Sequence, residues 1–165
     1  MDTANFVFRH PLGPIYGWFS QDGLQRLQLP RLDGPRKRVN LLHYSPNITL
    51  GRILADALGR HFSGMPEAFN EIPLDYPEAT DFQRSVWDGA RKVPWGTTCS
   101  YADLGQQIGR GRGAARAIGQ ALGANPIPIL VPCHRFLAAD GSLGGFSAGL
   151  KWKQTLLETE RIALV

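Results

Sequence analysis

SYADLGQQIGRGRGAARAIGQALG, residues 100–123, decides how the second half of this chain folds. Ser100 and Asp103 stand three residues apart, as at a capped helix start, and the glycines of 109–113 then interrupt the helical pattern. After them, an apolar face at helical spacing is predicted for Ala114, Ala117, Ile118, Ala121 and Leu122. Two short helices joined by a glycine turn form a helix-turn-helix pattern, although any helical hairpin has the same spacing.

The second of these helices carries few large side chains. Arg116 and Gln120 stand four residues apart on its polar side. Small residues let a helix approach either a DNA groove or neighbouring helices closely. A helix of this kind cannot read many bases in the major groove, so on DNA we expect it in the minor groove, with Arg116 reaching into the base stack.

The segment ILVPCHRF, residues 129–136, places a cysteine beside a histidine. Prolines 126, 128 and 132 stiffen the backbone around a short apolar run that leads to Cys133. A nucleophilic thiol needs a base, and His134 is adjacent. Because neighbouring side chains of an extended segment point to opposite faces, contact between the two requires a water or a local turn. A buried structural cysteine beside a chance histidine is the alternative.

The rest of the chain divides near residue 76. Strands are predicted for NFVFRH, IYGWFS and LQRLQL, with a turn at 21–23, and a helix for 49–62. The polar loop 31–40 contains Arg36-Lys37-Arg38, which either contacts phosphate or is simply solvated. EIPLDYPEAT reads as a linker, and Thr80 with Gln83 as a capping box before another helix. We therefore expect an α/β domain over 1–75 and a second domain over 76–165.

Composition narrows the class of protein. The net charge is +4, and within residues 89–135 basic side chains outnumber acidic ones by six to one, which suits DNA or an ordinary solvated surface. No apolar run reaches the roughly 20 residues of a membrane span, and the N-terminus does not read as a signal peptide. With only Cys99 and Cys133, a reducing, cytoplasmic setting (nuclear in a eukaryote) is expected. The spacing of His10, His43 and His61 predicts no metal site.

ILVPCHRF resembles the active-site motif of the O6-alkylguanine-DNA alkyltransferases, also called methylated-DNA–protein-cysteine methyltransferases. FQRSVW, VPWG, SYADLGQQIG, AARAIGQALGANPIPILVPCHR, GGFSAG and KQTLLETE stand in the order of that family over about residues 78–162. PLGPIYGWFSQDGLQRL resembles the start of its first domain. The resemblance implies an α/β N-terminal domain, ribonuclease-H-like with a small sheet plus a helix, followed by a mainly helical, winged-helix-like domain with a helix-turn-helix.

The resemblance also implies a single-turnover reaction in DNA repair. Cys133 would accept the alkyl group from O6-alkylguanine in duplex DNA, with O4-alkylthymine as a secondary substrate. His134 would act as its base through a water, and Glu160 would hold and polarise that histidine. Arg116 would fill the gap left by the flipped nucleotide, while Tyr101 would crowd the adjacent phosphate and offer its hydroxyl to the base. No cofactor is implied, the partner is double-stranded DNA containing alkylated guanine, and a monomer is expected.

Further pocket residues follow from the same resemblance. Asn125 would brace the turn before the active-site segment, and the Phe136 carbonyl would face the guanine amino group. In the loop 144–149, Phe146 would wall the pocket and the Ser147 amide would face the leaving oxygen. Two residues depart from the family pattern: Phe146 replaces a usual tyrosine and Ala148 a usual glycine. The structural zinc of some relatives is not expected, because no cysteine precedes position 99.

Each assignment has a plainer alternative. Tyr101 could pack behind a helix, Glu160 could be an exposed helix carboxylate, and Asn125 before a proline is a common turn residue. Two other classes of protein also stay open. One is a DNA-binding module that flags lesions without repairing them. The other is a cysteine hydrolase or redox thiol that uses Cys133 and His134 without DNA.

Overall fold

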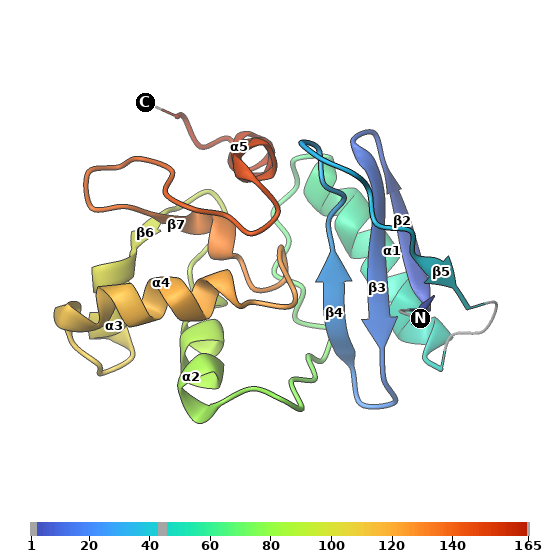
Figure 1. Cartoon of the computed structure of the whole chain (residues 1–165), viewed down its shortest axis with the longest axis horizontal. Coiled ribbons are helices and arrows are strands. Elements are labelled where there is room, and N and C mark those ends of the chain that lie inside the picture. Colours follow the sequence, from blue (N-terminus) through green and yellow to red (C-terminus); the bar gives the residue numbers. More distant parts are fainter. Residues whose placement is uncertain (1–2, 43–45, 165) are drawn as a thin grey trace.

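The computed structural model describes residues 3–42 and 46–164. Over these ranges a sheet-bearing N-terminal half lies beside a mainly helical C-terminal half (Figure 1). The strands are β1 (Thr3–Ala4), β2 (Phe6–His10), β3 (Gly13–Phe19), β4 (Leu24–Gln28), β5 (Asn40–Leu41), β6 (Cys99–Ser100) and β7 (Phe136–Leu137). The helices are α1 (Ile48–Phe62), α2 (Asp81–Ala90), α3 (Tyr101–Gln107), α4 (Ala115–Gly123) and α5 (Leu150–Thr159), with 3-10 turns η1 (Arg112–Ala114) and η2 (Cys133–Arg135).

An antiparallel sheet in the order β2-β3-β4 forms the centre of the N-terminal half. Ile15 and Phe19 of β3 are buried, in keeping with the period of two by which a strand turns one face to a core. The Ser20 amide donates to the Gly23 carbonyl at 2.9 Å and closes the turn into β4. Helix α1 lies against this sheet and contributes Leu54 to the core (Figure 1).

The C-terminal half consists of short helices that are fixed at their ends. Thr80 Oγ1 accepts from the Gln83 amide at 3.1 Å, and Gln83 Oε1 accepts from the Thr80 amide at 3.0 Å, so the predicted capping box begins α2. Trp87 Nε1 donates to the Ala121 carbonyl at 2.8 Å and holds α2 against α4. Gly109, at φ 75°, turns the chain between α3 and α4 in the left-handed region that favours glycine.

The two halves share one apolar core and are tied by backbone hydrogen bonds. Buried side chains run continuously from Phe6 in β2 to Leu156 in α5. The Leu27 amide of β4 donates to the Pro126 carbonyl at 2.9 Å. Trp152 Nε1 of α5 donates to the Pro30 carbonyl at 2.7 Å. The segment before Cys133 and the last helix are therefore both fixed to the N-terminal half.

Most elements expected from the sequence are confirmed with small shifts of their ends, including the helix predicted over 49–62, which is α1. One expectation about α4 is wrong: Ala117 is exposed beside Arg116 and Gln120, and only Ile118, Ala121 and Leu122 are buried. Ala114 lies in the turn η1 and is only partly buried against the core, so the buried stripe of α4 is narrower than the alanines suggest. His43 lies outside the described residues. Within the described ranges, no helix has the length and apolarity to cross a membrane.

Candidate active site

The backbone that carries Cys133 is a tight, buried turn. Ile129 adopts φ 76°, where β-branched residues are rare, and it is held there in the core at 1% exposure. The Val131 amide donates to the Ile127 carbonyl at 3.0 Å and closes the turn. After Pro132, Cys133 begins the 3-10 turn η2, so the extended geometry considered for this segment is wrong and the local turn is correct.

The thiol of Cys133 is nearly buried, at 8% exposure, and Asn125 is its polar neighbour. Asn125 Nδ2 donates to the Val131 carbonyl at 3.0 Å and to Cys133 Sγ at 3.2 Å, while Asn125 Oδ1 accepts from the Ile127 amide at 2.9 Å. Burial raises the pKa of Cys133 to about 11, against the opposing effects of Asn125 and Lys153. At rest the group is therefore a protonated thiol that needs a base.

Behind the thiol, one carboxylate joins two side chains from the same turn. Glu160, the residue after α5, is fully buried, and its Oε1 lies 2.6 Å from His134 Nε2. Arg135 Nε lies 2.9 Å from Glu160 Oε2, and the Gly96 amide donates to the same oxygen at 3.2 Å. Burial alone would raise the pKa of Glu160, but hydrogen bonds from His134 and Arg135 outweigh it and lower it to about 2. Glu160 is thus an ionised, buried carboxylate and not an exposed one.

His134 is neutral in this setting. Burial lowers its pKa, and the positive charges of Arg135 and Lys153 lower it further, against the attraction of Glu160. Since Arg135 already balances the carboxylate, a neutral imidazole donates Nε2–H to Glu160, and Nδ1 is left as a proton acceptor. Nδ1 is buried and has no hydrogen-bond partner among the residues that the structure describes. The imidazole therefore has the tautomer of a general base.

A cavity of about 440 Å³ opens onto the sulfur. Five of the residues singled out in the sequence line it together, namely Tyr101, Arg116, Cys133, Phe146 and Ser147. The Tyr101 ring stacks on the Phe136 ring, with centroids 6.3 Å apart, so Phe136 supports the cavity from behind while its carbonyl accepts from Lys153 Nζ at 2.6 Å. Over residues 3–42 and 46–164 no group of three potential metal ligands is found.

Comparison with known proteins places the chain in a family. Residues 81–162 match the family model for the DNA-binding domain of 6-O-methylguanine DNA methyltransferase. A methylated-DNA–protein-cysteine methyltransferase of Methanosarcina barkeri is 39% identical over 155 residues, covering 93% of this chain and 94% of that protein. The chain belongs to the methylated-DNA–protein-cysteine methyltransferase family. The crystal structure of Mycobacterium tuberculosis OGT in complex with DNA covers 96% of this chain and 93% of its own, at 34% identity and a TM-score of 0.77. A Pyrococcus kodakaraensis O6-methylguanine-DNA methyltransferase, at 23% identity, shares the fold with a TM-score of 0.69.

One residue of this alkyltransferase's site was missed by sequence reasoning. Lys153 in α5 is fully buried and donates to the carbonyls of Phe136, Leu143 and Gly145, so it fastens the loop that walls the cavity. Burial lowers its pKa to about 8, although Cys133 opposes this. The signal was present in the spacing, because positions 152, 153, 156 and 157 form one buried stripe of the helix.

Two further buried residues lie beside the site. Arg135 is one of the six basic residues within 89–135 that suit DNA or a solvated surface, but it is only 5% exposed and its guanidinium pairs with Glu160 inside the protein. His61 of α1 is fully buried, and its ring packs edge-on against that of His134 at a centroid distance of 6.4 Å. Burial, followed by the charge interaction with His134, lowers the pKa of His61 to about 3. The N-terminal half of this family member therefore reaches the catalytic histidine candidate directly.

Proposed function

We propose that this chain repairs DNA by transferring the alkyl group of O6-alkylguanine in duplex DNA to Cys133, once per molecule. The observation that carries the proposal is the cavity in which Cys133 lies with Tyr101, Arg116, Phe146 and Ser147, backed by the buried pair of His134 and Glu160. Family membership supports it, since the relatives are named for methyl transfer from DNA to a protein cysteine. The Mycobacterium tuberculosis relative bound to DNA supports the partner.

The target base must leave the helix to reach the sulfur. An alkyl group on a base edge is inaccessible within the stack, and extruding a nucleotide costs a few kcal/mol, less for a poorly paired lesion. Arg116 is exposed on α4 at the edge of the cavity, where it fills the space that the flipped nucleotide vacates. Tyr101, at the first turn of α3, crowds the adjacent phosphate and directs its hydroxyl to the base.

The chemical step begins with proton removal from the thiol. With a pKa of about 11, roughly one Cys133 in several thousand is ionised near pH 7.5, so a base must act. His134 Nδ1 takes the proton through a water, while Glu160 holds Nε2–H and stabilises the imidazolium. The sulfur then attacks the alkyl carbon in line as the bond from carbon to O6 breaks. The proton from sulfur returns to the departing guanine, and the products are a thioether and an unmodified base.

Groups on the cavity wall stabilise the leaving guanine. The Ser147 amide donates to O6, where negative charge develops, and the Tyr101 hydroxyl donates to the ring. The Phe136 carbonyl, which also accepts from Lys153, uses its second lone pair for the guanine amino group. Asn125 fixes the turn and the sulfur together. Phe146 forms an apolar wall without the hydroxyl of the usual tyrosine, which suits less polar alkyl groups.

The proposal extends to the organisation of the chain. We place an α/β, ribonuclease-H-like domain over 1–75 and a winged-helix-like domain with a helix-turn-helix over 76–165. The chain acts as a monomer in the compartment that holds the DNA, the cytoplasm or, in a eukaryote, the nucleus. O4-alkylthymine is a secondary substrate, because its exocyclic oxygen presents the same alkyl carbon.

The test is the intact mass of the protein after mixing with O6-benzylguanine. One benzyl adduct per chain is expected, absent from the Cys133→Ala variant and retained by Cys99→Ala, which removes the other free thiol. Binding to a lesion without any adduct would instead support a module that flags damage. Repeated turnover of a substrate in the absence of DNA would support a cysteine hydrolase or redox thiol.

A further inference from the structure

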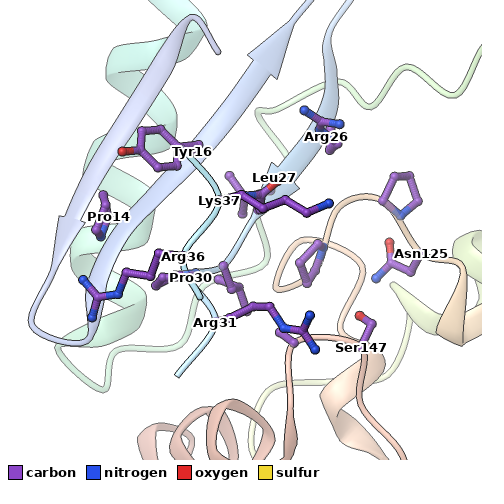
Figure 2. Close-up of a pocket in the computed structure, with 15 residues that line it drawn as sticks. Pro14, Tyr16, Arg26, Leu27, Pro30, Arg31, Arg36, Lys37, Asn125 and Ser147 are labelled. Carbon is purple, nitrogen blue, oxygen red and sulfur yellow. The ribbon is translucent and has the colours of Figure 1, made fainter. Parts of the chain in front are cut away.

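A second cavity, of about 450 Å³, lies at the boundary between the two halves (Figure 2). One wall comes from β3, β4 and residues 29–37 of the following segment, and the other comes from residues 125–128 and 147–148. We call it the boundary cleft. Its lining includes Arg26, Arg31, Arg36 and Lys37, and no carboxylate.

Three of these cations are free to take a ligand. Arg31, Arg36 and Lys37 are exposed, and none has an ionic or hydrogen-bonded side-chain partner within residues 3–42 and 46–164. Arg31 and Lys37 extend toward the wall that holds Ser147 and Asn125, whereas Arg36 is directed toward Pro14 (Figure 2). Arg26 is differently placed, with its guanidinium 3.5 Å from the centroid of the Trp18 ring. Unpaired positive charge concentrated in a cavity attracts an anion.

Hydrogen bonds fix three parts of the boundary cleft, namely β4, Pro30 and Pro126. The Leu27 amide donates to the Pro126 carbonyl at 2.9 Å across the boundary. Trp152 Nε1 donates to the Pro30 carbonyl at 2.7 Å from below the same segment. Pro30 and Pro126 themselves line the cleft and restrict its backbone. Arg31 directly follows the fixed Pro30, so one end of the segment that carries the cations is anchored.

The boundary cleft adjoins the alkyl-acceptor cavity. Ser147 lines both cavities, so the two are separated by a single residue of the pocket loop. Asn125, on the wall of the cleft, also donates to Cys133 Sγ at 3.2 Å. The basic cleft therefore lies beside the cavity that would hold the flipped nucleotide.

We propose that the boundary cleft binds backbone phosphates of the lesion-bearing strand, next to the flipped nucleotide, through Arg31 and Lys37. This inference rests on the proposed function and extends the DNA-binding surface from α4 to the N-terminal half. Long, exposed cationic side chains without partners suit phosphate oxygens, which attract them by charge whatever the base sequence. The contacts hold the strand in place and do not select the base.

The experiment compares the double variant Arg31→Gln/Lys37→Gln with a control that removes the same charge elsewhere in the same half, Arg9→Gln/Arg52→Gln. Both control arginines are exposed and lie outside the cleft. Affinity for a duplex containing O6-methylguanine is measured against salt, in a Cys133→Ser background that stops the reaction. Each lost phosphate contact is expected to lower affinity roughly eightfold near 0.1 M salt and to reduce the log–log salt slope by about 0.9. The double variant should thus bind DNA roughly 60-fold more weakly, with a salt slope reduced by about 1.8. The control variant should show no change in either quantity.

Two additional measurements distinguish this inference from the proposed function and from binding of free phosphate alone. With Cys133 intact, the double variant should react with free O6-benzylguanine at the wild-type rate, and the charge-keeping Arg31→Lys/Lys37→Arg should restore DNA affinity. Absence of an adduct in the wild type would overturn the proposed function, whereas a double variant that binds DNA as the control does would overturn this inference alone. This inference would also be overturned if tripolyphosphate binding depended on Arg31 and Lys37 but DNA affinity did not.

Discussion

Nε2 of His134 lies 2.6 Å from Oε1 of Glu160, and neither side chain is exposed to solvent. The same carboxylate is held by Arg135 Nε at 2.9 Å. The two partners of Glu160 have different roles. Arg135 balances the buried negative charge, so His134 can stay neutral. A neutral, oriented imidazole is what a thiol with a pKa of about 11 requires.

Replacing the shared carboxylate should lower the stability of the folded protein. Glu160→Gln leaves Arg135 as an uncompensated buried charge, so a loss of about 3–5 kcal/mol in the free energy of unfolding is expected from denaturant titration. The matched control is Glu158→Gln, exposed in the last turn of α5, which should change stability by no more than about 0.5 kcal/mol. Equal effects of the two substitutions would contradict the role given to the buried carboxylate.

Loss of the buried lysine should loosen the pocket loop. Lys153→Met removes the donor to the carbonyls of Phe136, Leu143 and Gly145. Hydrogen exchange should accelerate over residues 143–147, and the rate of alkyl transfer from O6-benzylguanine should fall by about 100-fold, as a small misplacement of reacting groups predicts. Lys151→Met, exposed two residues earlier, should leave both unchanged.

The buried thiol of Cys133 should ionise only at high pH. In a Cys99→Ser background, labelling of Cys133 by iodoacetamide should rise about tenfold per pH unit between about pH 7 and 9 without reaching a plateau, since only the thiolate reacts. Labelling rises with pH over this range because burial raises the pKa of Cys133. A plateau near pH 8 would mean that the thiol is exposed or strongly activated in the free protein.

His61 should make the protein sensitive to acid. Its pKa is about 3 when folded and about 6.5 when unfolded, so the unfolded chain binds the extra proton first, and stability is lost as pH falls from about 6.5 toward 3. Between about pH 7 and 5 this loss is ~2 kcal/mol, which His61→Phe should abolish. The measurement is urea unfolding of both proteins at each pH. Parallel pH curves for the two would contradict the burial of a neutral His61.

Arg116 should matter only when the base is stacked. Arg116→Ala removes the side chain that fills the vacated space, at a cost of about 2 kcal/mol, or roughly 30-fold in the rate on duplex DNA. Reaction with free O6-benzylguanine, which needs no flipping, should keep its wild-type rate. The comparison is a pair of single-turnover rates. Equal losses on both substrates would indicate that Arg116 acts on the chemistry and not on the duplex.

Local patterns in the sequence predicted the elements well. The Thr80–Gln83 capping box, the glycine turn at 109 and the spacing of α1 depend on residues close in the chain, so their physical causes can be read directly. The resemblance to the alkyltransferase family also implied that Tyr101, Arg116 and Ser147 belong to one site, and the structure brings them into a single cavity.

Long-range pairing could not be read in the same way. In the sequence, Arg135 looks like a surface charge. In the structure it pairs in the core with Glu160, which lies 25 residues later in the chain. The role of Lys153 similarly becomes visible only in the folded protein, where its Nζ donates to the Leu143 carbonyl of the pocket loop. The contact between His61 and His134 joins the two halves of the chain, and no local spacing indicates it.

The most direct test of the account follows a labelled methyl group from DNA to protein. A duplex carrying isotopically labelled O6-methylguanine is mixed with excess protein, and the protein is digested and mapped by mass spectrometry. One label per lesion should be found on the peptide containing Cys133, with guanine restored in the DNA and no second transfer by the same molecule. Label released as methanol, or fixed on any other residue while the Cys133 thiol stays free, would contradict the account.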